Sequence, residues 1–403
     1  MAEYGEIAAG LPQDWRVSTL GELVEDKGIS YGIVQPGNHI AQGIPIVRVK
    51  DLKNGRIDTT DPMRVAPEVE AAYARTRLSG GEVLLSLVGS VGESAVAPAS
   101  LAGWNVARAI GVLRVNKSIP AQWLNLCLST ELAQHYIGMF LNTTVQATLN
   151  LKDVRRLPIV IPPTEDMKAI TAVLTAVDDK IAVNDRITST ADGLRSSLLQ
   201  DAQKQRPDDF VAQPLSQVAE FINGRAFTKD ATGNGRMVVR IAEINSGPGP
   251  STVYNDIAVD EKHLAHPGDI LFSWSGSLTV TRWFRPEAII NQHIFKVIPH
   301  GDNPKWIAFE AVKSKLADYR TVAADKATTM GHIQRRHLDE EVVVPIPEAI
   351  DRLDRQAGSL WQRALVAEQE SLTLAALRDS LLPELMSGRL RVKDAEKFVE
   401  EAV

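Results

Sequence analysis

The chain repeats itself, and this internal repeat constrains its fold more than any other feature of the sequence. Residues Leu194–Leu199 (Leu-Arg-Ser-Ser-Leu-Leu) recur as Leu377–Leu382 (Leu-Arg-Asp-Ser-Leu-Leu), at an offset of 183 positions. The same offset relates Pro162 to Pro345, and each of these prolines closes an aliphatic run typical of a strand. A repeat of this length predicts two halves with the same order of elements.

Matches earlier in the two halves have a larger and less regular offset. Residues Gly81–Ser86 resemble Gly268–Ser273 at an offset of 187, and Leu20–Leu23 resemble Leu215–Val218 at an offset of 195. The offset between matching residues varies in the first part of each half and is constant in the last part. We therefore expect globular parts of different length, each followed by a helix of fixed length. Each half is expected to hold a strand-rich stretch, a helix, an aliphatic strand and a long helix.

A near-heptad apolar pattern marks the long helix of each half. Apolar residues recur at steps of three and four along residues 165–203, a helix of about 58 Å at about 1.5 Å per residue, and again 183 positions later. We therefore expect two long helices that pack antiparallel, with the polar Asn184 fixing their register. A shorter helix is expected in each half, from Ala121 to about Phe140 and from Pro304 to about Val322. The expected seam residues are Ile170, Leu174, Val177, Ile181, Asn184, Leu194, Leu198, Leu353, Leu360, Leu374, Leu377 and Leu381.

An ordinary buried helix pair inside one compact domain is the alternative to a spacer of this kind. The narrow apolar seam and its charged flanks, such as Asp178, Asp179 and Lys180, favour the spacer.

Charge and composition exclude several classes of protein. With 403 residues, 44% hydrophobic and 23% charged, the chain is neither disordered nor a mini-protein. Its one cysteine, Cys127, cannot form an internal disulfide or a paired-cysteine zinc site. The net charge of −6 argues against an indiscriminate nucleic-acid binder. Residues 16–115 and 221–300 are each +1, whereas the helical segments 164–205 and 348–403 are −2 and −3.

Targeting signals are not expected in this chain. Residues 1–6 have neither a basic region nor an apolar region of a signal peptide, and no apolar run approaches the roughly 20 residues of a membrane span. A soluble, cytoplasmic protein without membrane contact is expected.

No known catalytic motif is present. Residues 89–92 (Gly-Ser-Val-Gly) lack the Gly-Lys-Ser/Thr ending of a P-loop and the spacing of a dinucleotide-binding loop, so they predict a tight turn. His263 and His266 have a metal-like spacing but no evident third ligand. The sequence also lacks the Asn-Pro-Pro-aromatic tetrad that amino-methyltransferases use, and it has no helicase motif. We therefore expect neither catalytic residues nor a metal site.

Polar and basic side chains on predicted loops are the candidate binding residues. Arg, Gln, Asn and Thr are types that read base edges or hold phosphates. For each of these residues the alternative is an ordinary polar side chain on a solvated loop. For the tryptophan the alternative is packing in the core. The candidates are Tyr31, Gln35, Arg48, Lys50, Ser90, Arg108, Thr143, Thr144, Gln146, Arg225, Thr228, Arg240, Trp274, Ser275, Arg282, Asn291, Gln292, His293, Thr328, Thr329 and His332.

Three segments, read with the two-half layout, resemble a known family. They are residues 15–23 (Trp-Arg-Val-Ser-Thr-Leu-Gly-Glu-Leu), 31–37 (Tyr-Gly-Ile-Val-Gln-Pro-Gly) and 381–390 (Leu-Leu-Pro-Glu-Leu-Met-Ser-Gly-Arg-Leu). Together they are similar to the specificity subunit of type I restriction–modification enzymes, over about residues 11–392. Lys168 departs from the family pattern, which often has Gln there, although Gln356 keeps it in the second copy.

The resemblance implies an α+β fold: two mixed α/β target-recognition domains arranged pseudo-symmetrically and joined by two long antiparallel coiled-coil helices. The expected segments are a first recognition domain (1–163), a central spacer helix (164–206), a second recognition domain (207–346) and a C-terminal spacer helix and tail (347–403).

The resemblance also implies a function. Each domain would read one half of a bipartite, asymmetric site in double-stranded DNA, and the helices would set the spacing and dock two methyltransferase subunits, with restriction and translocase subunits as further partners. The subunit itself would be non-catalytic and hold no cofactor; S-adenosylmethionine, ATP and Mg²⁺ would belong to its partners. A non-catalytic, two-armed protein-binding scaffold is the alternative, whereas a methyltransferase in its own right is disfavoured by the missing motifs.

Overall fold

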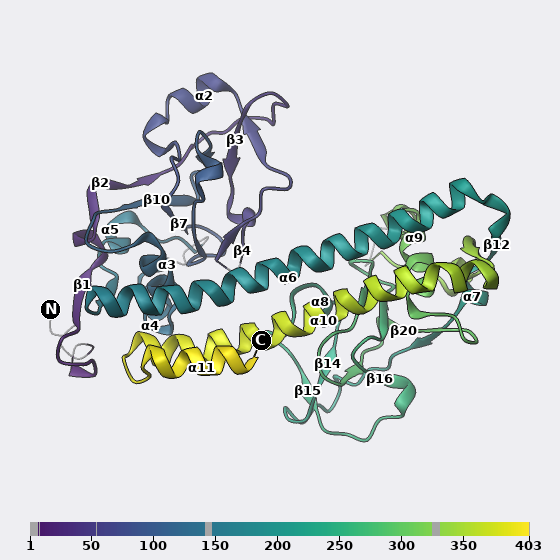
Figure 1. The fold of residues 1–403 in the computed structure, drawn as a ribbon. Coiled ribbons are helices and arrows are strands. Elements are labelled where there is room, and N and C mark those ends of the chain that lie inside the picture. The colour runs from purple at the N-terminus through teal and green to yellow at the C-terminus, as the bar shows by residue number, and fades with distance from the viewer. Residues whose placement is uncertain (1–6, 8, 54, 142–146, 325–330, 403) are drawn as a thin grey trace. The chain divides into compact units, whose positions relative to one another are not determined.

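The computed structural model describes residues 7, 9–53, 55–141, 147–324 and 331–402. Two compact units divide the chain: the first combines Met1–Asp179 with Ala375–Val403, and the second is Lys180–Leu374. Both long helices, α6 (Thr164–Gln205) and α10 (Pro347–Met386), contribute residues to each unit (Figure 1). The division into four segments expected from the sequence stays a prediction.

A four-stranded antiparallel sheet forms the centre of the first unit, in the order β2-β10-β7-β8. Its strands are β2 (Val24–Tyr31), β7 (Val83–Ser86), β8 (Ser94–Val96) and β10 (Ile110–Val115). Val83 and Leu113 of this sheet pack in one core with Trp123 of the following helix, α3 (Ala121–Ser129). Burial of these side chains is the main stabilising contribution to such a core.

The single helix expected from Ala121 to Phe140 is wrong, because the structure divides it into α3 and α4 (Glu131–Phe140). Thr130 has an extended backbone, and its hydroxyl accepts a hydrogen bond from the backbone N–H of Ala133 at 3.3 Å. This is the geometry of a helix N-cap, so Thr130 begins a new helix instead of continuing the first.

Smaller sheets and short helices complete the first unit. Strand β3 (Ile44–Val47) pairs antiparallel with β6 (Met63–Val65) and parallel with β9 (Asn105–Val106). The remaining elements are the hairpin β4 (Leu52–Lys53) and β5 (Arg56–Ile57), the pair β1 (Arg16–Thr19) and β11 (Pro158–Ile161), and the helices α2 (Pro67–Ala71) and α5 (Leu151–Val154).

The second unit repeats this arrangement. Its central antiparallel sheet has the order β13-β20-β17-β18, with strands β13 (Ala219–Asn223), β17 (Ile270–Ser273), β18 (Thr279–Arg282) and β20 (Ile294–Pro299). The smaller sheet has the order β15-β14-β19-β16, with strands β14 (Arg236–Val239), β15 (Tyr254–Asn255), β16 (Leu264–Ala265) and β19 (Ala288–Ile290). The other elements are β12 (Phe210–Pro214), paired with β21 (Glu341–Pro345), and the helices α7 (Leu215–Val218), α8 (Ile241–Ser246) and α9 (Lys305–Ala324).

The registers of the two central sheets give residue-by-residue equivalences. Ile110 pairs with Ser86 as Ile294 pairs with Ser273, and Gly111 pairs with Tyr31 as Phe295 pairs with Asn223. In the smaller sheets β3 runs parallel to β9 as β14 runs parallel to β19. The repeat seen in the sequence is therefore a repeat of strand order and register.

The two long helices pack together and run antiparallel. In the first unit Arg378 NH1 lies 3.0 Å from Asp178 Oδ1, and in the second Asn184 Nδ2 donates to Glu370 Oε2 at 2.8 Å. Since residue numbers fall along α10 as they rise along α6, the predicted antiparallel pair is confirmed. A short amphipathic helix, α11 (Val392–Ala402), follows α10 and packs on the first core through Ala395. The α+β class, two mixed domains and two long packed helices match the predicted fold.

Most of the predicted seam faces inward. Six of its residues are buried and five are partly buried. The buried ones are Ile170, Leu174, Val177, Asn184, Leu374 and Leu381, and the partly buried ones are Ile181, Leu198, Leu353, Leu360 and Leu377.

Leu194 is the exception, and its place in the predicted seam is wrong. Its side chain is 53% exposed, whereas the neighbouring Arg195 is fully buried. An α-helix drifts by about 20° per heptad relative to a strict seven-residue repeat, so a stripe that starts in the seam at Ile170 leaves it over several heptads. The buried face has moved to Ala191 and Arg195 at this point of α6.

Of the residues that the structure describes, none belongs to a helix long and apolar enough to cross a membrane.

Two equivalent glycines sit where the backbones of different strands approach closely. A Cβ on Gly32 would lie 2.2 Å from the carbonyl oxygen of Val106, and a Cβ on Gly224 would lie 2.2 Å from that of Asn291. These oxygens belong to the backbone and cannot move aside, so only glycine fits at either position.

We predict that Gly224→Ala destabilises the second unit by about 1–3 kcal/mol, the usual cost of forcing atoms into a packed site. Urea unfolding of the full chain measures this loss. Gly249→Ala is the matched control, because no atom lies within 4 Å of its Cβ position. Equal unfolding midpoints for the two variants would contradict the close approach.

Candidate nucleic-acid interface

The loops at one end of each central sheet gather into a cluster. In an antiparallel sheet the end of one strand lies beside the start of its neighbour, so the loops after β2 and β7 meet the loop before β10. We define the first loop cluster as residues 31–35, 87–91, 107–109 and 147–149. By the same registers, the second loop cluster is residues 223–227, 274–277, 291–293 and 331–333.

The same backbone hydrogen bonds hold both clusters. Leu87 N–H donates to the carbonyl of Ala109 at 2.7 Å, and at the equivalent place Trp274 N–H donates to that of His293 at 3.3 Å. Isolated bridges join Val88 to Thr148 and Ser275 to His332. The scaffold of the two clusters is thus the same although their side chains differ.

Predicted residues of the second half come together in the second loop cluster. Trp274 Nε1 donates to Asn223 Oδ1 at 2.9 Å, and the ring of Trp274 lies 5.6 Å from that of His293. Ser275 Oγ is 3.1 Å from His293 Nδ1, and Gln292 Nε2 is 3.3 Å from His293 Nε2. Trp274 and His293 are half-buried and Gln292 is exposed, so these side chains form a connected polar surface around an aromatic ring.

Three further candidates border this surface. The ring of His332 meets that of Trp274 edge-on at 6.3 Å. Arg225 is exposed and forms a parallel bridge with Asn291. Asn291 is buried, and its Oδ1 has no hydrogen-bond partner among the described residues. A buried amide oxygen without a donor costs free energy.

The first loop cluster presents different side chains on the same scaffold. Arg108 is exposed at the position of Gln292, two residues before β10, and Tyr31 occupies the position of Asn223. The hydroxyl of Tyr31 accepts a hydrogen bond from Leu151 N–H at 3.4 Å. Ser90 and Gln35 are exposed on the adjoining loops.

Asn223 is not among the residues predicted from the sequence. It lies one residue before Gly224, as Tyr31 lies one residue before Gly32, so aligning these two glycines would have identified it.

Arg48 and Arg240 are equivalent, and each caps the helical turn that follows it. Arg48 Nε donates to Asp51 Oδ2 at 2.9 Å, and Arg240 Nε donates to Glu243 Oε2 at 3.0 Å. The same carboxylates accept the backbone N–H of the arginines. These side-chain bonds raise the pKa of Arg48 and the pKa of Arg240. The geometry favours a structural role for both arginines over DNA contact.

Arg282 lies away from the second loop cluster and is only 2% exposed, bound to Glu368 of α10. Lys50 is exposed beside Arg48, and Thr228 is half-buried on the loop after Arg225. The candidates Thr143, Thr144, Gln146, Thr328 and Thr329 lie outside the described residues.

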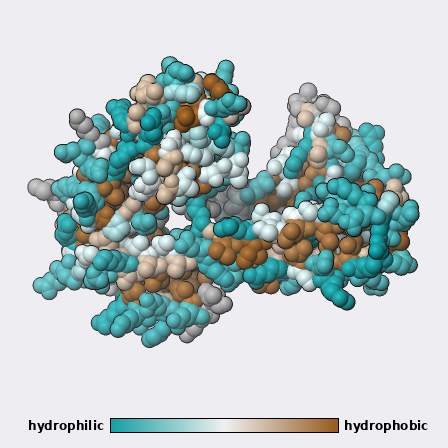
Figure 2. Space-filling model, turned by 45° about the horizontal axis from the view of Figure 1, so that its top comes forward, coloured by the Kyte–Doolittle hydropathy of each residue, from teal (hydrophilic) through white to brown (hydrophobic). Residues whose placement is uncertain are grey.

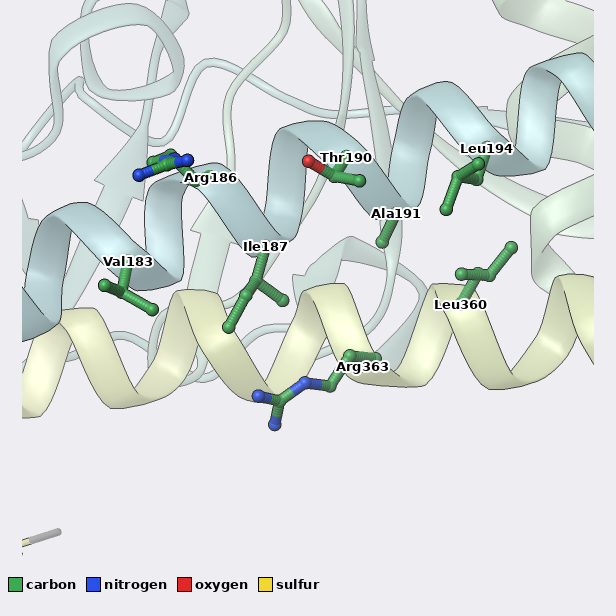
Figure 3. A pocket seen from close by; sticks show the side chains of 8 residues that line it. All are labelled: Val183, Arg186, Ile187, Thr190, Ala191, Leu194, Leu360 and Arg363. Atoms are coloured by element: carbon green, nitrogen blue, oxygen red, sulfur yellow. The ribbon is translucent and has the colours of Figure 1, made fainter.

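An apolar groove of about 500 Å³ runs along the helix pair in the second unit. It is lined by Val183, Arg186, Ile187, Thr190, Ala191, Leu194, Leu360 and Arg363. Figure 3 shows Ile187 and Ala191 of α6 directed toward α10, with Leu360 directed back toward Leu194. In the space-filling view, hydrophobic residues gather on the exposed surface of the long helices (Figure 2).

Within the part of the chain that the structure describes, no group of three or more His, Cys, Asp or Glu is arranged to hold a metal ion. His266 of the metal-like pair instead lies 2.6 Å from Glu261 Oε1 through its Nε2.

We predict a pH-dependent contribution of Glu243 to stability. Burial opposes its ionisation, but hydrogen bonds from Arg240 and Thr252 outweigh burial and hold the pKa of Glu243 below its usual range. A lowered folded pKa stabilises the fold above the unfolded pKa of about 4.3, and this gain is lost as the pH falls through the folded value. Glu243→Gln is therefore expected to cost about 1–3 kcal/mol at pH 7.

Urea unfolding at a series of pH values tests this prediction, because the difference between wild type and Glu243→Gln should shrink below about pH 4.3. A difference that stays constant with pH would contradict it. Glu220→Gln on β13, whose side chain is exposed, is the matched control.

Comparison with known proteins agrees with the fold. Residues 12–191 match the family model described as type I restriction modification DNA specificity domain. The specificity subunit of the type I restriction enzyme EcoBI from Escherichia coli is 27% identical over 162 residues, which are 40% of this chain and 34% of that protein. The EcoKI specificity subunit from Escherichia coli K12 is 25% identical over 309 residues, 67% of this chain and 64% of that protein. The matches thus span between a third and two thirds of these relatives' lengths.

A solved structure shares the fold. The S subunit of the type I restriction–modification system from M. genitalium superposes with a TM-score of 0.53 at 15% identity, covering 93% of this chain and 98% of that one. The resemblance expected from the sequence is confirmed: residues 12–191 match the type I restriction modification DNA specificity domain, and the chain is similar in sequence to type I specificity subunits and in fold to a solved one.

Proposed function

We propose that the chain reads a bipartite, asymmetric sequence in double-stranded DNA, one half with each loop cluster. This proposal rests on one observation: the two units repeat the same backbone scaffold but carry different side chains at equivalent positions. Positions equivalent by register hold Tyr31 and Asn223, and likewise Arg108 and Gln292. Two loop clusters with the same backbone but different side chains suit a DNA target whose two half-sites differ in sequence.

The side chains of each cluster suit base edges in the major groove. Arginine donates two hydrogen bonds to guanine, and glutamine or asparagine pairs with adenine in the same way. The first cluster offers the exposed Arg108, and the second offers Gln292 beside His293 and the ring of Trp274. The clusters would therefore prefer different base pairs.

The near-neutral charge of the two globular segments supports weak DNA binding by the isolated chain. Non-specific affinity for DNA comes from many phosphate contacts made by Lys and Arg. Residues 16–115 and 221–300 carry only one net positive charge each. In this proposal methyltransferase partners add phosphate contacts.

The helix pair is the proposed docking surface for methyltransferase subunits. The groove along α6 and α10 exposes Leu194 and Val183 by 53% and 46%, and the exposed Arg186 and Arg363 lie at its margins. An amphipathic helix with acidic flanks fits such a groove. The chain itself is proposed to be non-catalytic and to bring no cofactor, while its partners supply adenine methylation, ATP-dependent translocation and cleavage.

We predict that Arg108→Ala and Gln292→Ala each alter one half of the recognised sequence only. Loss of a two-bond base contact removes about 1–3 kcal/mol of discrimination at one base pair. Mapping N6-methyladenine by single-molecule sequencing in cells that carry each variant should show one relaxed position, in different halves for the two variants. Arg75→Ala, an exposed arginine outside the clusters, should leave the motif unchanged. Relaxation of both halves by one variant would contradict independent reading.

We also predict that Leu194→Glu weakens binding of the methyltransferase subunit by about tenfold or more, because it places a charge in the apolar groove. Titration calorimetry with the purified methyltransferase subunit measures the change. Since Leu194 is exposed, the free energy of unfolding should change by at most about 0.5 kcal/mol. Val211→Glu, at a residue 44% exposed on β12, is the matched control. Unchanged affinity for Leu194→Glu would rule out docking at this groove.

A further inference from the structure

A cluster of charged side chains, three of them buried, lies where the sheet and α9 of the second unit meet the helix pair. Five ionisable side chains from four elements form it: Asp192 and Arg195 of α6, Arg282 of β18, Glu310 of α9 and Glu368 of α10. All five belong to the second unit. None of them lies in the second loop cluster or lines the apolar groove of the helix pair.

Arg195 is the inner member of the cluster and is fully buried. Its Nε donates to Glu310 Oε1 at 3.0 Å, and its NH1 donates to Asp192 Oδ1 at 2.7 Å. The guanidinium also lies 5.2 Å from the ring centres of Phe309 and Trp361. Ions and rings thus fix this side chain from several sides, and Arg195 joins α6 to α9 of the domain.

Arg282 makes the second connection, from the sheet of the domain to α10. Its Nε and NH2 donate to the two oxygens of Glu368 at 2.7 and 3.0 Å, and its NH1 lies 3.4 Å from Asp192 Oδ1. The guanidinium lies 4.5 Å from the ring centre of Trp361. Burial disfavours its charge, but the bonds to Glu368 and Asp192 outweigh burial and raise the pKa of Arg282.

The first unit has no equivalent cluster among its described residues. The sheet register places Val96 where the second unit has Arg282, and the repeat offset places Ala375 where it has Asp192. Arg378, the counterpart of Arg195, is 27% exposed and pairs with Asp178 and Asp379 instead. It borders a cavity of about 270 Å³.

The difference between the units matters because ion pairs are directional. The hydrophobic effect is non-directional, whereas a buried charge that loses its partner is strongly unfavourable. A two-bond fork such as Arg282 to Glu368 also fixes the angle between its two side chains. We propose that this cluster locks the orientation of the second recognition domain on the helix pair and so makes the chain selective for one gap length between the two half-sites. The inference rests on the proposed function, in which the helices set the spacing of the half-sites.

The test replaces one ion pair by apolar side chains of similar length, Arg282→Met together with Glu368→Met. Such replacements often preserve stability. In cells that carry the full chain and its partners, N6-methyladenine mapping should find the same half-site sequences. Methylation at sites with a gap one base pair longer or shorter should rise by roughly tenfold or more relative to wild type. Arg378→Met, at the half-buried counterpart of Arg195, is the matched control and should keep the single gap.

A folded double variant that methylates only the wild-type gap would overturn the inference. If the double variant does not accumulate as a folded chain, Arg282→Lys provides the test. Lysine keeps the positive charge but cannot donate the two parallel hydrogen bonds that the guanidinium makes to Glu368. It should relax the gap in the same direction to a smaller extent, and an unchanged gap would again overturn the inference. A wild-type chain with no gapped motif at all would instead refute the proposed function.

Discussion

The antiparallel packing of α6 against α10 is the interaction on which both units depend. Each unit completes its core with one end of the helix pair. Ile170 and Leu174 of α6 join Leu381 of α10 in the first core, whereas Ala357 and Trp361 of α10 join the second. Between these regions Asn184 donates to Glu370, and Lys180 Nζ lies 2.7 Å from the same carboxylate. Apolar contacts hold the helices together, and this polar group is the kind of feature that specifies a single register.

The two units share a backbone scaffold but not the side chains at their loop ends. Strand order, register, the loop hydrogen bonds and the close glycine approaches at Gly32 and Gly224 are shared by both units, so they serve the fold. The side chains at the loop ends differ between the units, as the proposed reading of two different half-sites requires. The capping arginines follow the same logic: Arg48 and Arg240 are repeated with their carboxylate partners, as a structural feature would be.

Much of this organisation could be predicted from the sequence, and the exceptions have physical causes. The repeat and the heptad pattern predicted the long helices because local periodicity depends on neighbouring residues alone. Leu194 left the seam because helical drift accumulates over several heptads. The burial of Arg195 could not be predicted, since its partner Glu310 is 115 residues distant in sequence and an isolated arginine resembles a surface residue. The capping role of Arg48 and Arg240 did leave a signal: an acidic residue follows each at the same spacing, at Asp51 and Glu243.

Exchange of the second recognition domain tests independent reading most directly. Residues 207–346 would be replaced by the equivalent segment of a relative with a known target, and N6-methyladenine would be mapped in cells that carry the hybrid and its partners. Independent reading predicts that one half of the gapped motif changes to the relative's half-site while the other half stays the same. A hybrid that assembles with its partners and methylates but changes both halves of the motif, or neither, would contradict it.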